Sequence, residues 1–149
     1  FNLSVPEPTG VVVACAPAGE QGTSLLGAVL TLGPILVSGN TAVLALHPTQ
    51  SLPGLSFAEV IHSSDVPAGV VNVLSGERAE LMGWMADHRD VNALDLMGAS
   101  ELDFADLESR AAETLKRVLT PVKAVPERSL ERIRAFTEVK TIWHTKALG

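Results

Sequence analysis

Short apolar runs alternate with amphipathic stretches along the chain up to about residue 119. The continuous apolar run Val11–Ala16 is typical of a strand that is buried on both faces. Further strands are expected at 41–46, 70–74 and 93–97, with helices at 24–38, 55–63 and 77–87. This alternation predicts an α/β fold, a parallel sheet covered by helices on both sides. Right-handed crossovers then favour a doubly wound arrangement.

The pattern changes over the last third of the chain. Residues 100–119 carry apolar side chains at helical spacing, which predicts a long helix ending the first unit, residues 1–119. Pro121 and Pro126 then interrupt any helix, and Phe136–Trp143 alternates like a strand without a neighbouring turn or partner strand. Residues 120–149 are therefore expected to form a tail whose extended strand pairs with another sheet.

The charge balance and the cysteine content indicate which binding partners are excluded and which cellular compartment is expected. The chain has 17 acidic and 11 basic residues, a formal net charge of −6, and the basic residues are scattered. Nucleic-acid binding needs clustered Lys and Arg. The most apolar stretch, Ser24–Val37, is shorter than a membrane span, and Cys15, the only cysteine, suits a reducing compartment. We expect a cytoplasmic protein without nucleic-acid or membrane partners.

Six short segments resemble motifs that occur together in the aldehyde dehydrogenase superfamily. They are residues 8–12 (PTGVV), 36–44 (LVSGNTAVL), 65–76 (DVPAGVVNVLSG), 88–94 (HRDVNAL), 96–102 (LMGASEL) and 136–142 (FTEVKTI). They are similar, in this order, to the family's P-x-G-V-V, L-A-A-G-N-T-V-V-L, L-P-x-G-V-x-N-V-V-x-G, H-P-x-V-x-x-I, F-T-G-S-T-E-V and Y-T-E-V-K-T-V. The resemblance implies a Rossmann-like cofactor domain and a C-terminal strand that belongs to an oligomerisation element.

The residues that this family uses for catalysis have no counterpart in the chain. Aldehyde oxidation needs a nucleophilic thiolate, a general base and an oxyanion donor. Cys15 lies in a predicted strand, where a small buried side chain is expected. The family's E-L-G-G-K segment is missing between Asp103 and Pro126, and P-A-G at 17–19 replaces its P-W-N. We therefore predict no catalytic residue and, because the four histidines have no paired spacing, no metal site.

The resemblance implies NAD or NADP as the cofactor, but changed residues predict weak binding. Ala45 and Pro48 stand where the family has the Lys and Glu that contact the adenosine ribose. Asp103 replaces the last glycine of the pyrophosphate turn. Its negative charge, and that of Glu101, oppose an anion at the helix start.

Four residues remain as expected cofactor contacts: Gly76, Gly98, Ala99 and Ser100. They follow strand ends, where ligands of open α/β sheets bind. Two interpretations stay open for the glycines, which are either remnants of a nucleotide crevice or residues that serve their turns only. Ser100 has an alternative role as a helix cap together with Asp103.

Three functional hypotheses follow. In the first, the chain is a non-catalytic assembly or regulatory partner that binds itself or a full-length aldehyde dehydrogenase through the strand Phe136–Trp143. In the second, it is an NAD(P)-dependent oxidoreductase component that works only with catalytic residues of another chain. In the third, it is a decayed gene product or a proteolytic remnant without activity.

Overall fold

A five-stranded parallel sheet forms the centre of the molecule. The computed structural model describes residues 1–18, 24–121 and 129–145. The strands are β2 (Val11–Cys15), β3 (Thr41–Ala45), β4 (Val71–Leu74), β5 (Ala93–Asp95) and β6 (Arg117–Leu119), and their order in the sheet is β4-β3-β2-β5-β6. All neighbouring pairs are parallel. The chain proceeds outward from β2 to β4 and then crosses to β5 on the other side of β2, which confirms the predicted doubly wound sheet.

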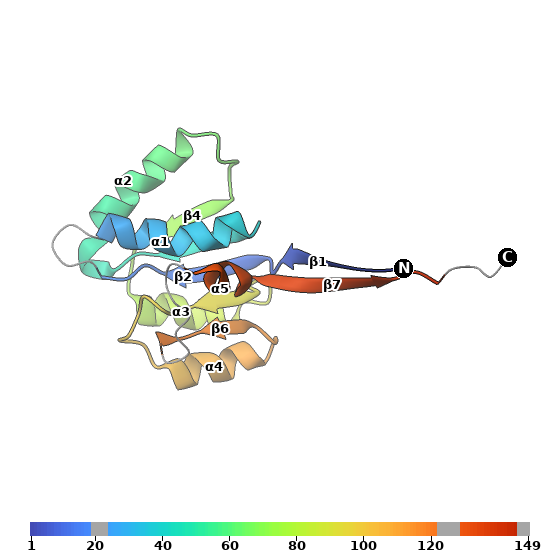
Figure 1. The fold of residues 1–149 in the computed structure, drawn as a ribbon. Coiled ribbons are helices and arrows are strands. Elements are labelled where there is room, and N and C mark those ends of the chain that lie inside the picture. The colour runs from blue at the N-terminus through green and yellow to red at the C-terminus, as the bar shows by residue number, and fades with distance from the viewer. Residues whose placement is uncertain (19–23, 122–128, 146–149) are drawn as a thin grey trace.

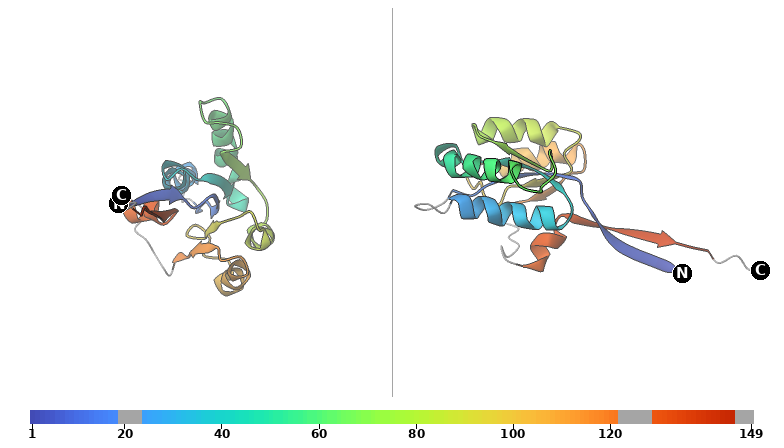
Figure 2. Two further views of the ribbon diagram at one scale, coloured as in Figure 1. Left: turned by 90° about the vertical axis from the view of Figure 1, so that its right-hand side faces the viewer. Right: turned by 90° about the horizontal axis from the view of Figure 1, so that it is seen from above.

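Helices cover both faces of this sheet. The helices α1 (Ser24–Val37) and α2 (Ser51–His62) lie on one face, and α3 (Arg78–Asp87) and α4 (Phe104–Ala112) lie on the other (Figures 1 and 2). In the described residues, no helix has the length and apolar character needed to cross a membrane.

The central strand β2 shows why its sequence is apolar without interruption. Val12 and Ala14 point into the core under α1, whereas Val13 and Cys15 point into the core under α3 and α4. All four side chains are fully buried. A strand with a helical layer on each side has no solvent face, so the alternation of polar and apolar residues disappears.

The apolar pattern gives the wrong boundaries for α4. The segment 100–119, for which spacing predicts one helix, contains α4, a turn and the fifth strand β6. Leu115 adopts a left-handed backbone conformation with φ of 57° in this turn, which no helix accommodates. The periodicity continues through the turn because Leu107 and Ala111 of α4 and Val118 of β6 contact the same core.

The helix α2 also begins earlier than the predicted residue 55. A short 3₁₀ helix (Pro48–Gln50) leads directly into α2 at Ser51. Pro53 therefore lies in the first turn of α2, where the missing N–H has no intrahelical partner to lose. The Pro-rich stretch that looks like a loop is a helix start.

The two ends of the chain form an antiparallel pair of strands. β1 (Asn2–Pro8) pairs with β7 (Thr137–Trp143), from Asn2 opposite Trp143 to Pro8 opposite Thr137. This pair, the β1–β7 ribbon, extends away from the helical layers (Figures 1 and 2). The expectation that the C-terminal strand lacks a partner within its own chain is therefore wrong. Pro6 and Pro8 conceal β1 as a strand, because proline is usually excluded from strand interiors.

The tail is fastened to the sheet just before β7. The short helix α5 (Leu130–Arg134) precedes Phe136, whose ring is fully buried in the core under α1. Asn40 donates from its amide nitrogen to the Phe136 carbonyl oxygen at 2.9 Å and accepts the Gly10 N–H at 2.7 Å. Arg117 donates to the carbonyl oxygens of Ala135 and Thr137 at 2.6 and 2.8 Å. These bonds hold the base of the ribbon rigidly against the body.

Candidate functional site

The candidate site is the edge of the sheet at the carboxyl ends of β2, β3 and β5, which we call the crevice after its place in doubly wound folds. Ligands of doubly wound sheets bind there because the strand order reverses and the loops on the two sides diverge. In this chain the reversal lies between β2 and β5. Ala16 and Leu46 directly follow β2 and β3, and Gly98 lies in the turn after β5.

A buried arginine fills the crevice. Arg78, in the first turn of α3, is only 2% exposed. Its Nε donates to the Leu46 carbonyl oxygen at 3.1 Å, and Nη1 donates to the Gly98 carbonyl oxygen at 3.1 Å. Nη2 donates to the carbonyl oxygens of Ala16 and, at 3.5 Å, Ala45. The guanidinium therefore bridges the ends of three strands.

A carboxylate completes the surroundings of this guanidinium. Glu101 accepts from Arg78 Nη1 at 3.0 Å, and its own side chain is half exposed. A guanidinium has five N–H donors, and four carbonyl oxygens and one carboxylate oxygen surround the group here. A buried charge is stable only when it is paired and hydrogen-bonded in this way.

The four residues expected to contact a cofactor lie in three different environments. Gly98 is pressed against the end of β2: a Cβ there would lie 2.5 Å from the Pro17 nitrogen and closer still to the Cys15 carbonyl oxygen. Ala99 is fully buried in the core under α3 and α4. Ser100 and Gly76 are exposed. For Gly98, close backbone packing is thus a sufficient reason for glycine.

A side chain at the start of α4 caps this helix. Asp103 is the N-cap, and its carboxylate accepts the N–H groups of Ala105 and Asp106 at 3.1 and 3.2 Å. Ser100, the predicted cap, lies before the helix begins. Because N-cap carboxylates satisfy the free N–H groups that would otherwise attract an anion, this helix start already carries its negative charge.

The only thiol of the chain lies inside the sheet. Cys15, the last residue of β2, is fully buried. Burial raises the pKa of the Cys15 thiol to about 12, while the neighbouring Arg78 charge opposes this shift. Since the thiolate is the nucleophilic form, Cys15 is inert near neutral pH.

A second buried ion pair joins β5 to the tail. Asp95 contacts Arg132 of α5 at 2.5 Å, and both side chains are buried. Its Oδ1 accepts the Met97 N–H at 3.2 Å. Burial raises the pKa of the Asp95 carboxyl from 3.8 to about 6, and the Arg132 charge opposes that rise. In the described part of the chain, Arg132 Nε and Nη1 have no hydrogen-bond partner, so the guanidinium of this pair is only partly hydrogen-bonded.

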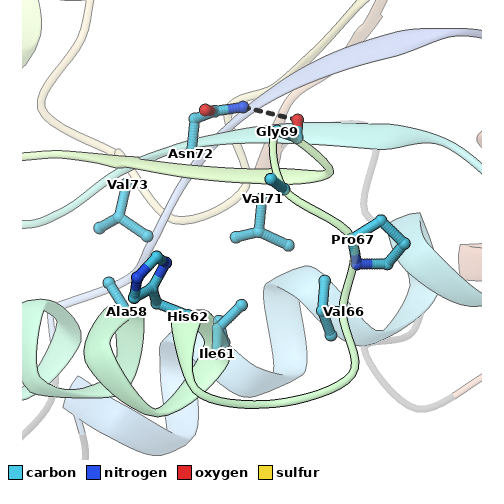
Figure 3. Close-up of a pocket in the computed structure, with 10 residues that line it drawn as sticks. Ala58, Ile61, His62, Val66, Pro67, Gly69, Val71, Asn72 and Val73 are labelled. Carbon is cyan, nitrogen blue, oxygen red and sulfur yellow. Dashed lines mark hydrogen bonds between the residues drawn. The ribbon is translucent and has the colours of Figure 1, made fainter.

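A separate surface hollow lies between α2 and β4. It has a volume of about 340 Å³, and Val71 and Val73 point into it toward Ala58, Ile61 and His62 (Figure 3). The Asn72 amide points to the other side of the strand and donates to the Gly69 carbonyl oxygen at 2.9 Å. His62 is the only titratable residue of its lining. The hollow is thus distinct from the crevice and lacks a second group for acid–base chemistry.

The described residues contain no cluster of side chains that could bind a metal ion. Nowhere in residues 1–18, 24–121 and 129–145 do three or more His, Cys, Asp or Glu side chains gather closely enough to hold a metal ion. The ring of His47 contacts the Thr49 hydroxyl at 3.0 Å, and His88 accepts the Asp90 N–H at 3.2 Å. These two histidines serve their local turns.

The sequence pattern does not reveal the residues that dominate the crevice. Arg78 stands in the first turn of a helix, where a charged residue is usually solvated. Its position two residues after Gly76, at a strand end, is the only available signal. Asp95 offers a clearer one, because a charge inside a predicted buried strand requires a partner. That the partner is Arg132 follows only from the fold.

Comparison with known proteins agrees with these elements. The sequence model of the aldehyde dehydrogenase family matches residues 1–122. Hydroxyisobutyraldehyde dehydrogenase of Mycolicibacterium austroafricanum is 35% identical over 101 residues, which are 68% of this chain and 19% of that protein. An aldehyde dehydrogenase of Aspergillus niger is 32% identical over 118 residues, 79% of this chain and 23% of that protein. The chain thus spans about a fifth of the length of these relatives.

Solved structures show the same fold. An aldehyde dehydrogenase of Bartonella henselae superposes with a TM-score of 0.65 at 24% identity, covering 80% of this chain and 24% of that one. Betaine aldehyde dehydrogenase of Staphylococcus aureus, in complex with NAD+, gives a TM-score of 0.67 at 21% identity, covering 80% and 23%. These structures agree in fold, and the sequence matches establish that this chain belongs to the aldehyde dehydrogenase family.

Proposed function

We propose that this chain is a non-catalytic member of its family that acts as an assembly partner, binding a second copy or a full-length aldehyde dehydrogenase through the free edge of β7. The observation that carries the proposal is the β1–β7 ribbon. It lies away from the sheet and offers an extended strand edge to other chains. Strand edges with free N–H and C=O groups bind other strands by β-augmentation.

The register of the ribbon identifies which edge is open. Phe1 and His144 exchange both backbone hydrogen bonds, and such pairs alternate with non-hydrogen-bonded pairs along an antiparallel ladder. The pairs Ser4–Thr141 and Pro6–Val139 are therefore non-hydrogen-bonded, and their backbone groups point outward. The Ser4 and Thr141 hydroxyls, 3.0 Å apart, agree with this close pairing.

The two outer edges differ in their donors. On the β1 edge, the outward positions include Pro6 and Pro8, which have no N–H. On the β7 edge, the outward positions Val139, Thr141 and Trp143 all have one. Their side chains share one face of the strand, and Val139 and Trp143 are 72% and 74% exposed. The β7 edge therefore combines free donors with an apolar surface.

The proposed lack of aldehyde oxidation is argued from the state of the thiol and the carboxyl groups in this chain. Its single thiol is buried and stays protonated, with a pKa of about 12. The buried carboxyl nearest the crevice, Asp95, is paired with Arg132. Aldehyde oxidation through a thioester requires an accessible thiolate and a free base. Among the described residues at the strand ends, the thiol is buried and the carboxyls of Asp95 and Glu101 are paired with arginines.

The test is a sedimentation-velocity measurement of the chain alone and mixed with a full-length aldehyde dehydrogenase. Proline at position 141 removes an outward N–H without removing a ladder bond between β1 and β7, so Thr141→Pro is expected to abolish association. Ser4→Pro is the matched control, because it loses the same hydroxyl contact but blocks the other edge. A wild-type chain that stays monomeric in both samples, or equal association of the two variants, contradicts the proposal.

A further inference from the structure

We infer that the buried Arg78 side chain occupies the position where this fold binds a dinucleotide pyrophosphate. Arg78 therefore prevents NAD and NADP from binding to this chain. The crevice of this fold normally offers N–H groups to phosphate oxygens. In this chain the described strand ends present carbonyl oxygens, and these already bind the Arg78 guanidinium. The inference is independent of the assembly proposal.

The hydrogen-bond polarity of the crevice is the first reason. The carbonyl oxygens of Ala16, Leu46 and Gly98 converge on the guanidinium from three strand ends. A pyrophosphate carries negative oxygens, which only donors or cations stabilise. If Arg78 swung out, the pyrophosphate would meet these carbonyl oxygens. If Arg78 stayed, its donors would already be engaged.

The surrounding charge is the second reason. Glu101 lies 3.0 Å from the guanidinium and neutralises it. The Asp103 carboxylate caps the start of α4, and Asp106 in the same first turn is paired with Arg110 at 3.5 Å. Asp103, which stands where the family has the last glycine of the pyrophosphate turn, therefore adds a negative charge at this helix start, and like charges at short range repel.

The space is the third reason. The turn at Gly98 lies directly on the end of β2, with no gap for even a methyl group. Arg78 itself is buried below the surface of the crevice. Binding a dinucleotide would therefore require both the removal of a buried charged side chain and the separation of two loops. Each buried carbonyl left without a donor adds to that cost.

The direct test is calorimetric titration of the wild-type chain with NAD and with NADP at millimolar concentration, together with a thermal-shift measurement. The inference predicts no binding heat and an unchanged melting temperature. Saturable heat with either nucleotide, accompanied by a rise in melting temperature, overturns it. Since the wild-type chain is used, the folding of a variant does not enter.

The carbonyl oxygens of Ala16, Leu46 and Gly98 form a cage around the Arg78 guanidinium. Chemical rescue of an Arg78 variant tests whether this cage binds a guanidinium. Arg78→Ala is expected to lower the melting temperature by roughly 5 °C or more, because buried acceptors lose their donors. Millimolar methylguanidinium should recover part of this loss, whereas methylammonium should not. Arg110→Ala is the matched control, since Arg110 is a partly exposed arginine that pairs with Asp87 on the surface. Equal responses of the two variants to methylguanidinium contradict the cage.

If Arg78→Ala does not fold, an NMR measurement on the wild-type chain still tests whether the Arg78 guanidinium is fixed in place. The Nε–H of a guanidinium fixed to a buried carbonyl exchanges slowly with water and gives a separate proton–nitrogen NMR signal. Arg78→Lys should remove that signal and so assign it. The inference predicts a protected signal that NAD leaves unchanged. A fast-exchanging Arg78 Nε–H, or one that NAD shifts, overturns the inference.

Discussion

At the scale of single residues, buried charge distinguishes this chain from a simple apolar core. Arg78 and the pair Asp95–Arg132 both lie at the carboxyl ends of strands. Both arginines join segments far apart in the sequence: Arg78 joins three strand ends, and Arg132 joins α5 to β5. Groups of this kind are costly to bury and very sensitive to the loss of a partner.

The Asp95 carboxyl should make stability depend on pH in an unusual direction. Its pKa is raised from 3.8 to about 6 on folding, so the folded state holds this proton after the unfolded state has released it. The unfolding free energy of the wild type, relative to Asp95→Asn, should therefore fall as the pH rises from about 4 to about 6. Urea unfolding of both proteins across this range measures the difference. A difference that increases with pH would show that the Arg132 charge outweighs burial.

The Cys15 thiol should be unreactive in the folded chain. Burial raises its pKa to about 12, and its side chain has no solvent-exposed surface. We expect no reaction with a disulfide reagent at pH 8 and a full stoichiometric reaction once the chain is unfolded in urea. Rapid labelling of the native protein would mean that the end of β2 opens, and would remove one argument against turnover.

At the scale of elements, the apolar pattern correctly predicts a strand or helix whose surroundings stay the same from its first residue to its last. Strand β2 is recognised because both of its faces are buried. Helix α4 and strand β6 are merged because they share a core, and only the backbone turn at Leu115 separates them. Strand β1 is missed because it carries two prolines, which an edge position of a two-stranded ribbon tolerates.

The assignment of the α4 cap makes a prediction at this scale. Asp103→Ala should destabilise the chain by about 1 kcal/mol, the usual effect of losing an N-cap. Ser100→Ala is the control, and because Ser100 is exposed and lies before the helix, it should change stability by less than about 0.5 kcal/mol. Chemical denaturation of the two variants tests this. A larger effect at Ser100 would restore the serine cap that the sequence suggests.

At the scale of the whole molecule, the fold combines a protruding two-stranded ribbon with a sheet edge that the Arg78 side chain occupies. The doubly wound sheet was predictable from the strand–helix alternation, and the family from its motifs. The pairing of β1 with β7 was not, because it joins segments at opposite ends of the chain whose local patterns carry no information about each other. The same holds for the crevice: the glycines at its rim are visible in the sequence, whereas the arginine inside is recognised only from the fold.

The measurement that tests the assembly claim most directly is amide-resolved hydrogen exchange along β7. The ladder places the N–H groups of Lys140 and Ile142 toward β1 and those of Val139, Thr141 and Trp143 toward the free edge. In dilute solution the first set should be protected and the second should exchange rapidly. In the assembled state, Val139, Thr141 and Trp143 should gain protection while Ser4 on the β1 edge stays unchanged. Protection gained at Ser4, or no change at the β7 edge on assembly, would contradict the account.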